Sequence, residues 1–330
     1  MFDEIDCYMR KPYLACTIVL ALSTFSFSCK KSSENKGTDD PPPYELLFLR
    51  GDLNNNTQSG ICRSTGGADN FTIIKAVGSG FTSDSFFSTA LHSPQFGPNN
   101  EIIFLASFKD FAKEKPYSMN MSGSNIKKLT DEADANYFNI NVSPKSGRMV
   151  CEREIRSLDQ YQLISCNADG SNVKVIKTLQ YGYTNWGFGG ANWFPDGETI
   201  LFSVQNGTNT DSPMELYSIK WDGTGEKKLS NTNDRLYLHM SVSPNGKKIL
   251  YTQRKNGQYD VYVVNSDMSN NHEVTILYNN TTSYLNMNWS SDSRWFACRS
   301  LGNNLMLIDS EGDGSKSKVI AHSSTGGSIK

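Results

Sequence analysis

The chain has 330 residues, of which 20% are charged, and its formal net charge at pH 7 is −2. Because 32 basic side chains nearly cancel 34 acidic ones, no net positive field attracts phosphates, and nucleic acid is not expected as a partner. Aromatic residues make up 11% of the chain and glycines number 26, a composition that favours many short strands joined by turns.

An export signal is predicted at the N-terminus. Arg10 and Lys11 precede an apolar stretch, 14–27, that is too short to span a bilayer. The segment resembles a bacterial lipoprotein signal, which implies that residues 1–29 form a signal peptide whose Cys29 is lipidated and anchors the chain to a membrane. An ordinary secretory signal with an incidental cysteine is the alternative.

A tether and a folded domain are expected after the signal. Residues 30–43 read KKSSENKGTDDPPP, a polar and proline-terminated sequence that predicts a disordered tether. The folded domain is expected to occupy residues 44–330.

The domain contains four cysteines: Cys62, Cys151, Cys166 and Cys298. If 148–154 and 160–166 form a hairpin, Cys151 lies opposite about position 163, which places its sulfur beyond disulfide reach of Cys166. We therefore expect buried thiols rather than a disulfide framework, although an oxidising compartment would permit one.

A sequence pattern recurs about every 50 residues, the period of propeller blades and related arrays. Its copies are QFGPNNEIIF (95–104), NVSPKSGRMVC (141–151), NWFPDGETILF (192–202), SVSPNGKKILY (241–251) and NWSSDSRWFAC (288–298). The fourth position of each copy is a turn marker, and these markers are Pro98, Pro144, Pro195, Pro244 and Ser291.

Each copy predicts one four-stranded unit. A short strand, the marker turn and a β-rich strand are followed by a variable loop, an aromatic strand, a second turn and a last strand. The second turns read SGSN, ADGSN, WDGTG and SEGDG. Residues 44–76 form a further unit without an obvious first strand. Six candidate second strands thus predict an all-β fold, a six-bladed β-propeller of four-stranded antiparallel blades.

Two of these units resemble the TolB-type propeller repeat: WFPDGETILF with ELYSIKWDGTGEKKL, and VSPNGKKILY with DVYVVNSDMSN. The resemblance covers about 44–322 and implies a closed propeller. Ring closure is where the chain departs from the pattern, and residues 324–330 are the expected source of the missing first strand.

The first strand of each blade is expected to line the central channel. Seven positions before each marker the residues are mostly aromatic: Leu91, Tyr137, Phe188, Tyr237 and Tyr284. Three positions before it they are amides or a hydroxyl: Gln95, Asn141, Asn192, Ser241 and Asn288. Five positions before it they are Ser93, Asn139, Gly190, His239 and Asn286.

These three sets of equivalent positions have two interpretations. In the functional one, a channel-rim site binds a ligand with the aromatic residues Tyr137, Phe188, Tyr237 and Tyr284, the amides Asn141, Asn192 and Asn288, and the histidines His92 and His239. In the structural one, the amides satisfy backbone groups and water, and the aromatic rings pack between adjacent blades.

No catalytic motif is found. The sequence has neither G-x-S-x-G nor H-E-x-x-H, and its four histidines are widely separated. His92 and His239 fall near the starts of first strands and resemble a two-histidine channel site of propeller-type pectate-fragment lyases. A metal site needs at least three ligands, so we expect no metal, no cofactor and no catalytic residue.

The sequence therefore predicts a monomeric, membrane-anchored lipoprotein of the bacterial cell envelope, either periplasmic or surface-exposed. Its propeller is expected to be a non-catalytic binding module for an envelope protein segment or a glycan at the channel mouth. The alternatives are a polysaccharide lyase or hydrolase that uses His92 and His239, and a purely structural subunit of an envelope complex.

Overall fold

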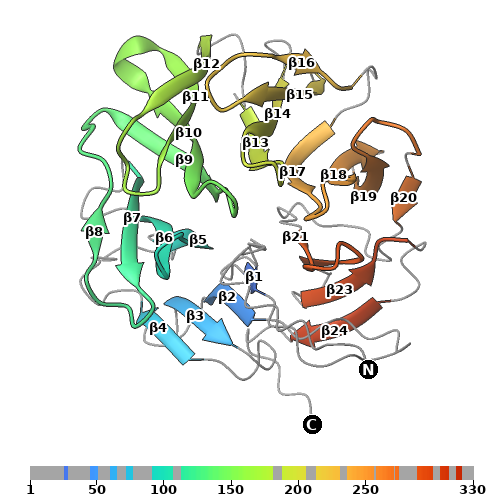
Figure 1. The fold of residues 1–330 in the computed structure, drawn as a ribbon, viewed down its shortest axis with the longest axis horizontal. Coiled ribbons are helices and arrows are strands. Elements are labelled where there is room, and N and C mark those ends of the chain that lie inside the picture. Colours follow the sequence, from blue (N-terminus) through green and yellow to red (C-terminus); the bar gives the residue numbers. More distant parts are fainter. Residues whose placement is uncertain are drawn as a thin grey trace, which may run out of the picture.

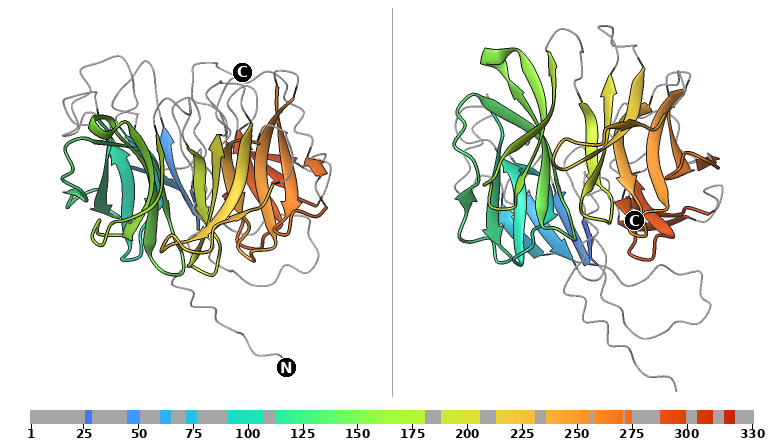
Figure 2. Two further views of the ribbon diagram at one scale, coloured as in Figure 1. Left: turned by 90° about the horizontal axis from the view of Figure 1, so that it is seen from above. Right: turned by 45° about the horizontal axis from the view of Figure 1, so that its top comes forward.

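The structure, a computed structural model, describes residues 26–28, 45–50, 60–64, 72–76, 91–106, 113–180, 188–205, 213–230, 236–255, 258–270, 272–274, 288–299, 305–311 and 317–321. Within these residues the strands form six four-stranded antiparallel sheets, arranged as a ring (Figure 1). Figure 2 shows the same blades standing side by side around the ring axis. The predicted all-β propeller architecture of four-stranded antiparallel blades is confirmed.

We number the blades in chain order. Blade 1 contains β1 (Ser26–Ser28), β2 (Glu45–Arg50), β3 (Gly60–Ser64) and β4 (Thr72–Ala76). Blade 2 contains β5 (Leu91–Phe96), β6 (Glu101–Ala106), β7 (Lys115–Asn120) and β8 (Lys127–Lys128). Blade 3 contains β9 (Ala135–Val142), β10 (Arg148–Ile155), β11 (Gln160–Asn167) and β12 (Lys174–Gln180), with the 3-10 turn η2 (Arg156–Leu158) between β10 and β11.

The other three blades follow the same order. Blade 4 contains β13 (Phe188–Trp193), β14 (Thr199–Gln205), β15 (Met214–Lys220) and β16 (Lys227–Lys228). Blade 5 contains β17 (Leu236–Val242), β18 (Lys248–Lys255), β19 (Gln258–Asn265) and β20 (His272–Val274). Blade 6 contains β21 (Asn288–Trp289), β22 (Trp295–Arg299), β23 (Leu305–Asp309) and β24 (Ser317–Ala321).

The hydrophobic core lies in the seams between blades. On β14, Ile200 and Phe202 face blade 3, while Leu201 packs against Met240 and Val242 of blade 5. Because both faces of a second strand are covered, its sequence is continuously apolar rather than alternating. This explains why the ILF and ILY segments are the most visible part of the repeat.

The marker turns have a simple local cause. Gly197 has φ +73°, and its N–H donates to the carbonyl of Phe194 at 3.1 Å. The Asp196 carboxylate accepts the N–H groups of Glu198 and Thr199 at 2.9 and 2.8 Å. The Pro-Asp-Gly sequence therefore closes a turn that needs one left-handed residue and one side-chain acceptor.

The first strand of blade 1 comes from an unexpected segment. In β1, Ser26 pairs with Leu47 of β2, and β1 also lies beside β21 of blade 6. The strand that meets the last blade is thus drawn from the predicted signal peptide, whereas residues 324–330, Cys29 and the tether lie outside the described residues. The domain boundaries at 29 and 43 stay predictions.

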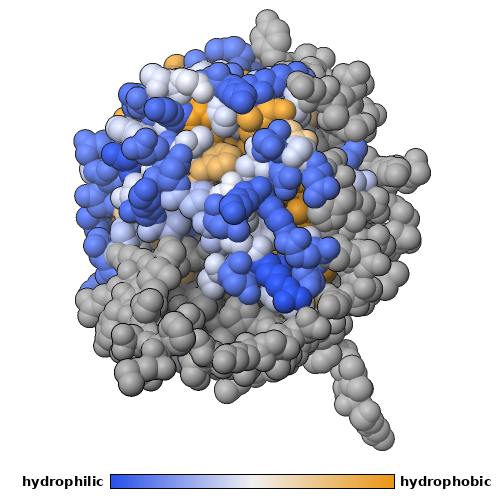
Figure 3. Space-filling view, turned by 45° about the vertical axis from the view of Figure 1, so that its right-hand side comes forward, coloured by the Kyte–Doolittle hydropathy of each residue, from blue (hydrophilic) through white to orange (hydrophobic). Residues whose placement is uncertain are grey.

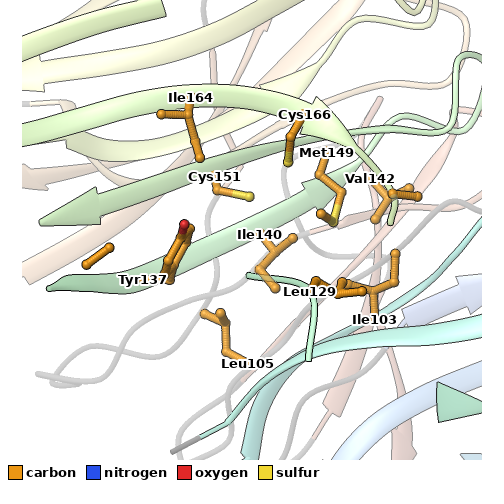
Figure 4. Packing of buried hydrophobic residues seen from close by; sticks show 12 residues of the cluster. Ile103, Leu105, Leu129, Tyr137, Ile140, Val142, Met149, Cys151, Ile164 and Cys166 are labelled. Atoms are coloured by element: carbon orange, nitrogen blue, oxygen red, sulfur yellow. The ribbon is translucent and has the colours of Figure 1, made fainter. Parts of the chain in front are cut away.

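Cys151 and Cys166 are buried free thiols, as predicted. Cys151 pairs with Ile164, one residue from the expected partner. Cys166 lies two residues further along β11 and therefore on the same face, so the two thiols are neighbours in one seam (Figure 4). The two thiols are therefore closer together than a pairing of Cys151 with position 163 would place them. The hydrogen bond with Cys166, together with burial, raises the pKa of Cys151.

In the described part of the chain, no helix combines the length and apolar character required to cross a bilayer. The described surface in Figure 3 is mainly hydrophilic, with small hydrophobic areas between the polar side chains.

Candidate functional site

The candidate site lies at one end of the ring, near blades 2 to 4. Ala135, the first residue of β9, pairs with Ile155, the last residue of β10. The starts of first strands and the ends of second strands therefore lie together, and we call this the upper end. Its described connections are 129–134 between blades 2 and 3, and 156–159 between β10 and β11.

Tyr137 does not present its ring to the channel. Its side chain is only 2% exposed and lies in the seam near Ile140 and Leu105 (Figure 4). Its hydroxyl donates to Glu132 Oε2 at 3.1 Å, and burial raises the pKa of Tyr137 to about 12. Phe188 is likewise buried, in the seam between blades 3 and 4. For these two residues the structure agrees with the interpretation in which aromatic rings pack between blades.

Asn141 connects two blades. Its Nδ2 donates to the carbonyl of Ala191 at 2.7 Å, and its own carbonyl accepts the indole N–H of Trp193 at 3.1 Å. The Asn141 amide thus satisfies a backbone group, as expected if the amides three positions before the markers have a structural role. Asn192 is half-buried on β13.

The remaining predicted site residues are placed only by their backbone or not at all. His92 lies on β5, Tyr237 and His239 on β17, and Asn288 on β21, while the side chains of these four are outside the described part. Tyr284 lies outside the described residues. Their roles as ligand-binding residues stay predictions.

A charged network holds the 129–134 connection in place. The Lys115 ammonium donates to the carbonyls of Glu132 and Ala135. Lys115 is only 8% exposed, and burial lowers its pKa to about 8. Lys113 donates to the carbonyl of Ala133 at 3.1 Å and to Asp134 Oδ1 at 2.8 Å. This connection is therefore fixed by side chains from blade 2.

Arg153 extends the network into blade 3. Its Nη1 donates to Glu132 Oε2, and its Nε and Nη2 donate to Gln162 Oε1 at 3.0 and 2.8 Å. Nη1 also lies 3.4 Å from the hydroxyl of Tyr137. The guanidinium is thus bound by groups from β9, β11 and the 129–134 connection, and its geometry is strongly restricted.

Glu152 faces the opposite seam. Its Oε2 accepts the amide of Asn139 at 2.9 Å, and its carboxylate also accepts the backbone N–H of Gly190 in blade 4. Glu152 is 4% exposed, and Oε1 has no hydrogen-bond partner among the described residues. Burial raises the pKa of Glu152 to about 7.

Glu152, Arg153 and Lys115 were not singled out from the sequence. The available signal is the charged triplet 152–154, which interrupts a second strand that is otherwise buried and apolar. Leu158 was also missed. It lies in η2 at the upper end and, at 56%, is the most exposed large apolar side chain among the described residues.

The comparisons with known proteins support the architecture. No family model and no curated protein matches the sequence. Among solved structures, TolB from Acinetobacter baumannii superimposes with a TM-score of 0.63 at 15% identity, over 83% of this chain and 63% of that one. The fold is a TolB-like β-propeller.

Two further solved structures share this fold. A putative TolB from Agrobacterium tumefaciens has a TM-score of 0.53 at 15% identity, over 76% of this chain and 83% of that one. An oligogalacturonate lyase in complex with manganese has a TM-score of 0.54 at 13% identity, over 96% of this chain and 79% of that one. The chain spans less than two thirds of the Acinetobacter TolB.

Proposed function

We propose that this TolB-like propeller is a non-catalytic binding module of the bacterial cell envelope that binds a protein segment or glycan at the upper end of its channel. One observation carries the proposal: the 129–134 connection is held rigidly by Lys113, Lys115 and Arg153. A rim that is already ordered loses little conformational entropy when a partner binds. Leu158 adds an exposed apolar contact at the same end.

The fold similarity to TolB favours a protein partner over a glycan. The module would act as a monomer attached to the membrane by a lipid on Cys29, with residues 30–43 as the tether. In this anchored form the signal peptide is removed together with β1 (Ser26–Ser28), which leaves β2 as the inner strand of blade 1. Metabolic labelling with a fatty acid tests the anchor: the wild-type chain should incorporate the label and a Cys29→Ser variant should not. Equal labelling of both proteins would exclude lipidation at Cys29.

A capture experiment tests the site. Leu158→Asp places a charge at the upper end. As the control, Val173→Asp places a charge at the opposite end, in the turn before β12, where Val173 is 42% exposed. We expect Leu158→Asp to lose proteins that the wild type captures from solubilised envelopes, and Val173→Asp to retain them. The reverse result would move the site to the other end of the ring.

A second candidate is a polysaccharide lyase or hydrolase with a metal in the channel. It is favoured by the fold similarity to the oligogalacturonate lyase in complex with manganese, and by the positions of His92 and His239 on β5 and β17. The test is formation of unsaturated uronate from oligogalacturonate with added manganese. Activity in the wild type that is lost in His92→Ala and His239→Ala would favour the enzyme.

A further inference from the structure

We propose that Glu152 binds a cationic group of the partner, the ammonium of a lysine or the guanidinium of an arginine, at the seam between blades 3 and 4. This inference rests on the proposed binding function and narrows its ligand to a basic protein segment. Glu152 is on a second strand, but its carboxylate contacts Asn139 of β9 and Gly190 of β13. These are first strands of adjacent blades, so the carboxylate lies beside the channel wall.

The carboxylate has no positive counter-charge among the described residues. Its partners are the neutral amide of Asn139 and a backbone N–H, and Leu163 lies opposite it on β11. Arg153 is adjacent in sequence, but its guanidinium points into the other seam, where Gln162 and Glu132 bind it. A buried acid without a counter-ion is costly, and such groups concentrate at functional sites.

One oxygen of this carboxylate is also unsatisfied. The N–H donor of Asn139 binds Oε2, while Oε1 has no partner among the described residues. Buried polar atoms are nearly always hydrogen-bonded, so an unpaired oxygen indicates a missing donor. Glu154 on the same strand has no such deficit, because Arg156 binds its Oε1 at 3.2 Å.

The neighbouring blade leaves this position free of a side chain. Five positions before the marker, blade 3 has Asn139 and blade 5 has His239, whereas blade 4 has Gly190. Gly190 has φ +124° and lies where the register shifts between Phe188 and Ala191. The glycine lets its own N–H reach the carboxylate and adds no side chain above it.

The chemistry of the site favours an organic cation. A carboxylate oxygen with free lone pairs accepts an N–H donor, and a positive charge on that donor strengthens the bond. A metal ion needs several further ligands, whereas Asn139 is the only described side chain bonded to the carboxylate. The ligand is therefore a lysine or arginine side chain.

The test uses the purified full-length chain and end-blocked, fluorescein-labelled pentapeptides of glycine with a central lysine, arginine or glutamine. At pH 8 we expect fluorescence anisotropy to show about ten-fold tighter binding of the lysine or arginine peptide than of the glutamine peptide. Glu152→Gln should abolish this preference, while the matched Glu154→Gln variant should retain it. Equal affinities in the wild type, or an unchanged preference in Glu152→Gln, would overturn the proposal.

Two further readouts separate this inference from the proposed function. The carboxyl ¹³C resonance of Glu152 should titrate at lower pH when the lysine peptide is present, because the cation binds the ionised form. No shift at millimolar peptide would count against the site. If envelope proteins are captured through Leu158 and the Glu152→Gln variant captures them equally well, the cation site is wrong and the binding function stands.

Discussion

The indole N–H of Trp193 donates to the backbone carbonyl of Asn141 at 3.1 Å, across the seam between blades 3 and 4. Trp289 makes the equivalent bond to the carbonyl of Ser241 at 3.0 Å, between blades 5 and 6. In both cases the tryptophan lies two positions before the marker, and the acceptor lies three positions before the marker of the preceding blade. The tryptophan of the repeat therefore connects the first strands of adjacent blades.

Replacing Trp193 by phenylalanine tests this connection. The variant keeps an aromatic ring in the seam but leaves the Asn141 carbonyl without its donor, so the free energy of unfolding should fall by about 1–3 kcal/mol. Urea denaturation measures the change. A cost near zero would show that water replaces the indole N–H at this position.

Glu152 should make stability fall as pH rises. Burial raises its pKa from 4.5 to about 7, so the folded state prefers the protonated acid. Protonated Glu152 stabilises the folded state fully below pH 4.5, the pKa of the acid in the unfolded chain. This stabilisation, about 3 kcal/mol, is lost as pH rises through the folded-state pKa of about 7. In Glu152→Gln this loss should disappear, and the variant should be more stable than the wild type at pH 8.

The measurement is urea denaturation at several pH values, with Glu154→Gln as the control. The control should follow the wild-type pH dependence. Parallel curves for the wild type and Glu152→Gln would show that Glu152 ionises as an ordinary surface acid.

Two glycines of the second turns should differ in their tolerance of alanine. At Gly170, φ is +83° and an added Cβ would lie 1.8 Å from the carbonyl oxygen of Leu129. At Gly225, φ is +68° but the nearest atom is 3.9 Å away, in the Lys220 side chain. We expect Gly225→Ala to cost about 1 kcal/mol from backbone strain alone, and Gly170→Ala to cost clearly more.

Denaturant midpoints of the two glycine variants, measured side by side, provide the comparison. Equal costs would mean that the contact between the second turn of blade 3 and Leu129, in the 129–134 connection, adjusts to an alanine without loss of stability.

Lys115 should control the order of the 129–134 connection. Lys115→Met keeps the length and apolar stem of the side chain but removes the donor to the carbonyls of Glu132 and Ala135. Hydrogen exchange should then accelerate at the amides of Leu129 and Tyr137, which bond to Pro116 and Glu114, while β14 amides remain protected. Unchanged exchange at both amides would show that the connection is held without Lys115.

The sequence alone was sufficient for the blade architecture. The Pro195-Asp196-Gly197 turn and the ILF strand after it depend on backbone preferences of adjacent residues, so their recurrence could be read without knowing the tertiary structure. The four-stranded antiparallel sheets were predicted on this basis and were found.

Only the tertiary structure decided which way the side chains face. Tyr137 and Phe188 are buried in seams, and Glu152 meets Gly190, because each seam joins residues of different blades that no local pattern relates. The sequence also could not identify the first strand of blade 1, because the edge of β2 offers backbone hydrogen-bonding groups to any extended segment. In the structure, β1 occupies this edge. Turns follow from neighbours in sequence, whereas seams and sites follow from neighbours in space.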